Sequence, residues 1–138
     1  FIFASGQKWV ANSFPARPHL YLAIEAVLRQ TFGTILTYDY NPSHRDHIHF
    51  DNGDKVGFRP HSKSRVLFLQ NAAHHLFDVM VSVDGVYGPE TQLAERAVRK
   101  ELGLGGFSNL ANWITFLDAS ADIAMDRAVE NEAWEMSA

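Results

Sequence analysis

The stretch His44-Arg45-Asp46-His47-Ile48-His49-Phe50-Asp51 is the most informative part of the chain, because three histidines and two aspartates fall within eight residues. Successive side chains of a β-strand point to opposite faces. A strand here would place His47, His49 and Asp51 on one face, and Ile48 and Phe50 on the other. Imidazoles bind zinc and transfer protons near neutral pH. The alternation therefore predicts a metal or acid–base site, with a half-buried strand whose outer face is merely rich in histidine as the alternative.

The composition limits the classes of protein to which the chain can belong. Its 138 residues make one domain or two small ones. The formal net charge of −4 and the lack of a basic run argue against nucleic acid as the main partner. No apolar stretch is long enough to predict a membrane span. Because there is no cysteine, any zinc must be held by nitrogen and oxygen ligands.

The first part of the sequence mixes strand and helix patterns. A strand pair is expected around Ser5-Gly6, and two further strands over residues 34–38 and 47–50, joined by a loop. Between them, an apolar stripe predicts a helix over residues 16–32, with Gly33 as its C-cap. The stripe consists of Leu20, Ile24, Val27 and Leu28. Residues 53–63 are rich in Gly, Pro, Lys, Arg and Ser, and we interpret them as a linker.

The second part of the sequence is dominated by helical periodicity. The residues expected to point inward are Val66, Leu69, Ala73 and Leu76 in a first helix, Leu93, Ala94, Ala97, Val98 and Leu102 in a second, and Leu110, Trp113, Ile114 and Leu117 in a third. Pro89 suits the first turn of the second helix, Glu95 and Arg99 form its outward ion pair, and Gly103 is its C-cap. Residues 118–138 form an acidic helical tail. The fold class is therefore α+β: a partial mixed sheet with one helix (1–52), then a small helical bundle (64–117).

Residues 32–51 carry a resemblance to a known family. Phe32-Gly33-Thr34-Ile35-Leu36 and the segment from Tyr40 to Asp51 resemble the C-terminal half of the extensin-like bacterial proteins. These belong with the D-Ala-D-Ala carboxypeptidase and murein endopeptidase group of zinc enzymes. The resemblance implies that His49 binds zinc, that His47 lies beside the metal and assists catalysis, and that His44 lines the same site. It makes zinc the expected cofactor and the peptidoglycan stem peptide the expected substrate.

A second resemblance covers roughly residues 64–104. Leu69-Gln70 and the segment Val83-Asp84-Gly85-Val86-Tyr87-Gly88-Pro89-Glu90-Thr91 look like the three-helix peptidoglycan-binding module. The resemblance makes Asp84, Gly85, Tyr87, Gly88 and Thr91 the candidate wall-binding residues; a generic turn before a helix is the alternative. A hydrolase beside a wall-binding module would act in the periplasm or cell wall, or as a phage lysis enzyme.

The zinc site expected from the resemblance is incomplete in this sequence. Family members carry a histidine and an aspartate upstream as two more ligands, and no segment of that form occurs here. We expect the chain to be a fragment whose N-terminal part lies elsewhere, so that a second polypeptide or a missing N-terminal segment completes the site. The alternatives are a degenerate homologue that binds the wall without cutting it, or a site rebuilt from residues such as Asp46, Asp51 or His61.

The resemblance also suggests roles around the metal. His47 is the candidate base, and Asp51 is either an acceptor that fixes an imidazole tautomer or an ordinary turn residue. Arg45 is a candidate partner for a substrate carboxylate, and Arg59 is another, although a solvated arginine is the alternative for both. The rival class is a non-enzymatic wall-binding protein, in which residues 64–117 carry the function. An intracellular adaptor is a third class.

Overall fold

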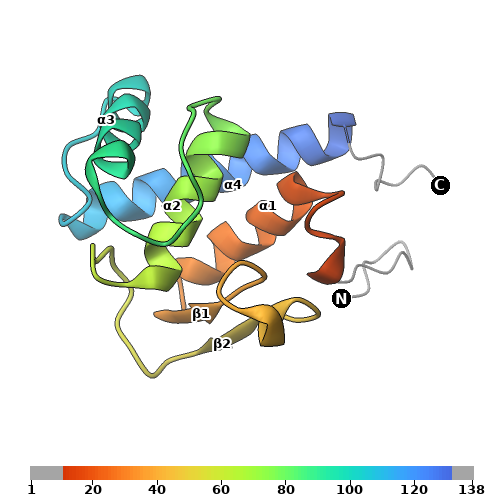
Figure 1. Ribbon diagram of the computed structural model, residues 1–138. Coiled ribbons are helices and arrows are strands. Elements are labelled where there is room, and N and C mark those ends of the chain that lie inside the picture. Colours follow the sequence, from red (N-terminus) through yellow and green to blue (C-terminus); the bar gives the residue numbers. More distant parts are fainter. Residues whose placement is uncertain (1–10, 132–138) are drawn as a thin grey trace.

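In the computed structural model, residues 11–131 form four α-helices and one two-stranded antiparallel sheet (Figure 1). The structure describes residues 11–131. The strand pair expected around Ser5-Gly6 and residues 132–138 of the expected tail lie outside the described residues. Over the described part, the mostly helical content with a small sheet agrees with the α+β class in its coarse form. No helix in this part has both the length and the apolar character needed to cross a membrane.

Helix α1 (Pro18–Arg29) begins with proline, as its fixed φ favours, but it ends earlier than expected. Its C-cap is Gln30, so the predicted capping role of Gly33 is wrong. The predicted stripe is also partly wrong, because Val27 is 57% exposed. The buried side of α1 instead includes Tyr21, Glu25 and Arg29. Helix α1 packs against α4 and α2.

The sheet pairs β1 (Thr34–Leu36) with β2 (His49–Asp51), so that Thr34 lies opposite Asp51 and Leu36 opposite His49. Both strands are shorter than predicted, and the loop between them contains the 3-10 turn η2 (Pro42–His44). His47 therefore precedes β2 and does not belong to its strand alternation. Another 3-10 turn, η1 (Ala11–Ser13), comes before α1.

Helix α2 (Lys63–Leu76) contacts α1, α3 and α4. Its N-cap is Ser62, whose hydroxyl accepts a hydrogen bond from the Arg65 amide (3.3 Å). The predicted inward face is confirmed, because all four of its residues are buried. The rest of the helix middle is buried as well, which a helix with neighbours on several sides requires.

Helix α3 (Pro89–Leu102) ends at Gly103, whose φ of +68° confirms the predicted C-cap. Ala94 and Val98 are buried as predicted, but Leu93 is 63% exposed and Ala97 is also exposed. Glu95, expected to point outward, is buried, and its carboxylate pairs with Arg99 (3.3 Å). The buried face of α3 is therefore rotated relative to the prediction. Hydrogen bonds join two residues of this face, Thr91 and Glu95, to Gln70 and Tyr87 respectively.

Helix α4 (Leu110–Asn131) runs without a break through the predicted boundary between residues 117 and 118. It lies along α1, with which it makes the most extensive helix pairing in the described structure (Figure 1). One cluster of buried apolar residues extends from Ala11 to Ala128. The described parts of segments 1–52 and 64–117 and of the tail thus share a core, whereas their separate functions stay a prediction.

Residues 53–63, which we expected to form a linker, are packed against the rest of the chain. Phe58 is 9% exposed, and its ring lies among those of Tyr87 (5.6 Å between centroids), Trp113 (5.0 Å) and Phe107 (6.2 Å). At the other end of the segment, the Asp54 backbone lies against Gly33, where a Cβ would come within 2.1 Å of the Asp54 carbonyl oxygen. Gly33 therefore permits a close backbone approach.

Candidate functional site

Three histidines of the 44–49 stretch come together beside the sheet. His44 ends η2, His47 lies in the turn that follows, and His49 opens β2. The His44 ring centroid is 5.0 Å from that of His47 and 6.5 Å from that of His49. We call these residues the histidine cluster. Because they lie within six positions of one another, the sequence alone predicted most of this proximity.

Each imidazole of the histidine cluster has one nitrogen held by an acceptor. His44 Nδ1 lies 2.7 Å from Asn41 Oδ1, and His47 Nδ1 lies 2.7 Å from Asp46 Oδ1. His49 Nε2 lies 2.6 Å from Asp51 Oδ2. The second nitrogen of each ring makes no hydrogen bond with the described residues. This arrangement fixes the ring orientation and leaves one nitrogen of each ring available as a ligand or proton acceptor.

The histidine cluster is open to solvent. The side chains of His47 and His49 are 53% and 46% exposed. Partial burial, followed by the charges of its two neighbouring histidines, lowers the pKa of His44. Hydrogen bonds from His47 and His49 lower the pKa values of Asp46 and Asp51 respectively. At neutral pH, the environment thus favours a neutral His44 beside two ionised carboxylates.

The chemistry of these side chains suits zinc, but their number and placement do not complete a site. Between residues 11 and 131, no three His, Asp or Glu side chains are grouped so that they could hold a metal ion. A catalytic zinc takes about three protein ligands and a water molecule. The described residues therefore fit only part of a zinc site.

The Asp51 carboxylate makes both of the contacts considered for it, one with a histidine ring and one within a turn. Its Oδ2 contacts His49, while its Oδ1 accepts a hydrogen bond from the Gly53 amide (2.7 Å) and so closes the turn after β2. Arg45 is exposed, and its guanidinium carbon lies 5.7 Å from the Tyr38 ring centroid. Arg59, the other candidate for a substrate carboxylate, is instead paired with Asp54.

The Asp84–Thr91 loop is built around Gln70, which is fully buried on α2. The Gln70 side-chain oxygen accepts from the amides of Asp84 (3.0 Å) and Gly85 (2.9 Å). Its nitrogen donates to Asp84 Oδ1 (2.9 Å) and to Thr91 Oγ1 (2.8 Å). Gly85 has a φ of +76°, which favours glycine at this turn. Sequence reasoning gave Gln70 no role, because nothing local marks an amide as the centre of a distant loop.

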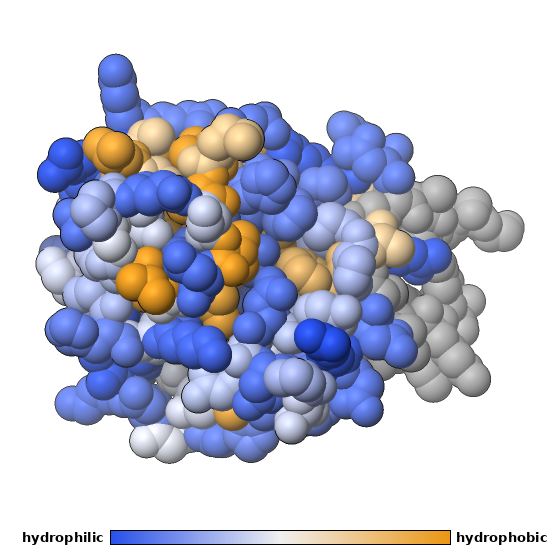
Figure 2. Space-filling model, viewed as in Figure 1, coloured by the Kyte–Doolittle hydropathy of each residue, from blue (hydrophilic) through white to orange (hydrophobic). Residues whose placement is uncertain are grey.

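The remaining candidates of this loop lie at the start of α3. The Tyr87 hydroxyl donates to Glu95 Oε1 (2.6 Å), which fixes the buried position of Glu95. Burial and this carboxylate raise the pKa of Tyr87 to about 12. Gly88 is the N-cap residue of α3. Apolar side chains are exposed over α3 and the loop before it (Figure 2), where Met80, Val83, Val86 and Leu93 are the exposed apolar residues.

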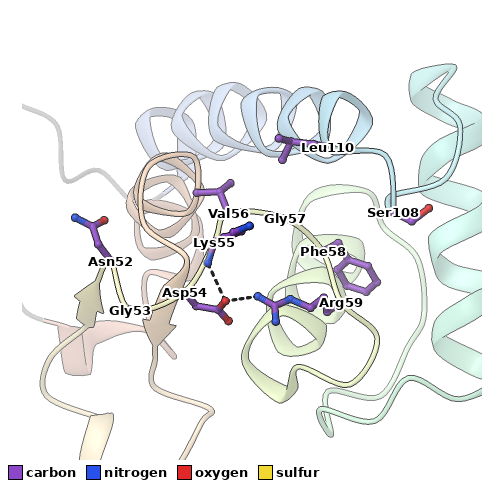
Figure 3. A pocket seen from close by; sticks show the side chains of 10 residues that line it. All are labelled: Asn52, Gly53, Asp54, Lys55, Val56, Gly57, Phe58, Arg59, Ser108 and Leu110. Carbon is purple, nitrogen blue, oxygen red and sulfur yellow. Dashed lines mark hydrogen bonds and ion pairs between the residues drawn. The ribbon is translucent and has the colours of Figure 1, made fainter.

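Two cavities lie on either side of Asp54. The first, of about 670 Å³, is bounded by residues 52–59 and by Ser108 and Leu110 next to α4 (Figure 3). In this view the Asp54 carboxylate accepts hydrogen bonds from the Lys55 amide (2.8 Å) and from the Arg59 guanidinium. The second cavity, of about 340 Å³, is lined by β1 and by the first turn of α2. None of the three histidines of the cluster lines either cavity.

Comparison with known proteins supplies no relative for this chain. No protein-family model matches the sequence, no curated protein matches it, and no solved structure is similar to it at a significant level. The interpretation of the site therefore depends on its own geometry and on the sequence motifs.

Proposed function

We propose that the chain is the C-terminal part of a zinc-dependent peptidoglycan peptidase of the D-Ala-D-Ala carboxypeptidase or murein endopeptidase type. The observation that carries this proposal is the histidine cluster, in which every ring has one nitrogen held by a carboxylate or amide oxygen and the other without a hydrogen bond to any residue from 11 to 131. Ligand and catalytic histidines of zinc enzymes are held in this way. The resemblance of residues 32–51 supports the same class.

In this proposal His49 is the zinc ligand. Asp51 holds Nε2, so the ring presents Nδ1 to the metal, and the Asp51 carboxylate makes that nitrogen a better donor. A zinc ion bound there would polarise the scissile carbonyl and lower the pKa of its water. Asp51 is in turn fixed by the Gly53 amide, so the turn after β2 sets the orientation of the ligand.

His47 is the proposed proton acceptor. Asp46 holds its Nδ1, which leaves Nε2 free to take a proton and to return it to the leaving amine. The lowered pKa of Asp46 keeps that carboxylate ionised, and an ionised carboxylate stabilises the imidazolium that forms. His44, whose ring lies 5.0 Å from that of His47, lines the same face in its neutral form.

The resemblance assigns only one zinc ligand to this chain. We therefore propose that another polypeptide, or a segment that precedes these residues, donates a histidine and an aspartate. The substrate would be the peptidoglycan stem peptide, and the protein would act in the periplasm or cell wall, or during phage lysis. Arg45, which is exposed, remains a candidate for a substrate carboxylate.

A non-catalytic wall-binding protein is the second candidate function. The observation that favours it is the set of exposed apolar side chains beside the Asp84–Thr91 loop, since exposed apolar surface often marks a binding face. Gln70 holds that loop rigidly against α2, so the face is pre-formed. In this case the histidine cluster would have no catalytic role.

Intact mass and metal analysis of the protein from its natural source, combined with a muropeptide hydrolysis assay, tests the proposal. We expect zinc and hydrolysis to accompany either a longer form or a second chain, and the isolated 138-residue chain to bind zinc only weakly and to hydrolyse nothing. Robust turnover by this chain alone, with zinc added, would show that the ligands are assigned wrongly. Binding to sacculi without zinc or hydrolysis in any form would favour the second candidate.

A further inference from the structure

The smaller of the two cavities, which we call the β1–α2 cleft, is lined mainly by polar groups. Its lining includes β1, the first residues of α2 and the N-cap residue of α2. The residues of the lining with polar side chains are Thr34, Tyr40, Asp54, His61, Ser62, Lys63, Ser64 and Arg65. No role was assigned to this cleft from the sequence motifs.

Positive charge exceeds negative charge in the cleft. Lys63 and Arg65 are cationic and His61 can become so, whereas Asp54 is the only acidic residue in its lining. Asp54 is already paired with Arg59 and with Arg65 (3.6 Å). Burial, followed by the neighbouring Arg59 charge, lowers the pKa of Arg65. This excess is local, because the whole chain has a net charge of −4.

The Lys63 ammonium is held at the edge of the cleft. It donates to the Tyr40 carbonyl oxygen (2.7 Å) and lies 4.9 Å from the Tyr40 ring centroid. An ammonium has three donors. The other two N–H donors of Lys63 make no hydrogen bond within the described residues, and Lys63 forms no ion pair with any of these residues. A cation that is held by a carbonyl oxygen and an aromatic ring keeps its charge for an incoming anion.

Tyr40 connects the cleft to the histidine cluster. Its ring lies edge-on to that of His44, with 5.9 Å between centroids. The Lys63 ammonium lies over the same Tyr40 ring. A molecule with its anionic group at Lys63 would therefore lie next to the side chains proposed above for catalysis. Arg59 is less suited to this task, because Asp54 already neutralises it.

We propose that the β1–α2 cleft binds the free carboxylate end of a peptide, with Lys63 as its main charged partner and His61 at the rim. The identity of the peptide as a peptidoglycan stem rests on the proposed function. A carboxylate suits the cleft because the Lys63 ammonium, which forms no ion pair within the described residues, matches a singly charged end, and the Ser62 hydroxyl in the lining can donate a hydrogen bond to it. Inorganic phosphate is the competing anion that the experiment must distinguish.

The test is an NMR titration of the isotope-labelled, EDTA-treated chain with N-acetyl-D-alanyl-D-alanine and with its C-terminal amide. The free acid should shift the amide signals of Tyr40, His61 and Lys63, and the amide derivative should not. Lys63→Met should weaken binding of the acid about tenfold or more, whereas Lys63→Arg should largely retain it. Lys55→Met is the matched control, because Lys55 is an exposed lysine that lines the other cavity.

Equal binding of acid and amide, or undiminished binding by Lys63→Met, would overturn the proposal. Phosphate that competes as strongly as the dipeptide would overturn it too, because the cleft would then be a general anion site. The titration contains no zinc, so its result is independent of the metal and hydrolysis assays. Binding at the cleft with no hydrolysis by any form of the protein, longer or complexed, contradicts only the proposed function. Hydrolysis by such a form without binding at the cleft contradicts only this inference.

Discussion

The carbonyl oxygen of Asp54 occupies the space where residue 33 would carry a side chain. A Cβ added to Gly33 would lie 2.1 Å from that oxygen and 2.7 Å from the Lys55 carbonyl carbon. Arg65 strengthens the same junction by donating to the carbonyl oxygens of Gly33 (2.9 Å) and Lys55 (2.6 Å). Residues that we expected to form a linker are therefore fixed to the beginning of β1.

Gly33→Ala should destabilise the protein by about 2 kcal/mol or more, because the neighbouring atoms are backbone and cannot rotate away. Urea denaturation measures the change. Gly88→Ala is the matched control: its Cβ would meet nothing within 4 Å, and its φ of −101° is open to alanine. We expect that control to cost less than about 1 kcal/mol. Similar losses in both variants would show that the contact at Gly33 is not tight.

Gln70→Leu should cost about 3 kcal/mol, because it removes the acceptor of two backbone amides and the donor to Thr91. Leucine fills a similar volume, so the loss reports mainly on the missing hydrogen bonds. Gln92→Leu, the same change at an exposed position on α3, should stay within about 0.5 kcal/mol. If thermal or urea unfolding cannot distinguish the two variants, Gln70 does not hold the loop.

His75 should make the protein less stable as the pH falls below about 6.5. Burial, followed by the charges of His74 and His19, lowers the pKa of His75 from 6.5 to about 4. The unfolded chain therefore binds the proton first, so the stabilisation is complete above pH 6.5 and is lost as the pH falls towards 4. Because the ring is only half-buried, we expect a loss of about 1–2 kcal/mol.

Comparing His75→Phe with the wild type over this range isolates that effect. Phenylalanine keeps the contact with the Phe14 ring, which lies 6.0 Å from the imidazole centroid, and cannot be protonated. Its stability should fall less steeply between pH 6.5 and 4 than that of the wild type, whereas exposed His61→Phe should leave the slope unchanged. Identical slopes for all three proteins would rule out His75 as the source of the pH dependence.

Periodicity predicted which segments are helical, but it did not fully predict which side each helix buries. The face of α2 was predicted correctly because its apolar residues repeat clearly and the helix has neighbours on several sides. On α3 the pattern pointed Leu93 inward, yet Thr91 and Glu95 are buried through hydrogen bonds to Gln70 and Tyr87. Those contacts join residues that are distant or polar, so hydrophobic spacing carries no signal for them.

The same distinction applies to the candidate site. The histidine cluster could be located from the sequence because its members are near neighbours along the chain. The β1–α2 cleft could not, since Lys63 and Tyr40 are far apart in the sequence and meet only through the packing of α2 beside β1. The close contact of Gly33 with Asp54 was missed for the same reason.

Zinc titration of the 138-residue chain, monitored with a competing chromophoric chelator, tests the central claim most directly. We predict weak zinc binding by the wild type, because the chain supplies only part of the ligand set. His49→Ala should lose this binding, and exposed His74→Ala, which lies outside the histidine cluster, should retain it. Undiminished zinc binding by His49→Ala would contradict the assignment of His49 as the metal ligand.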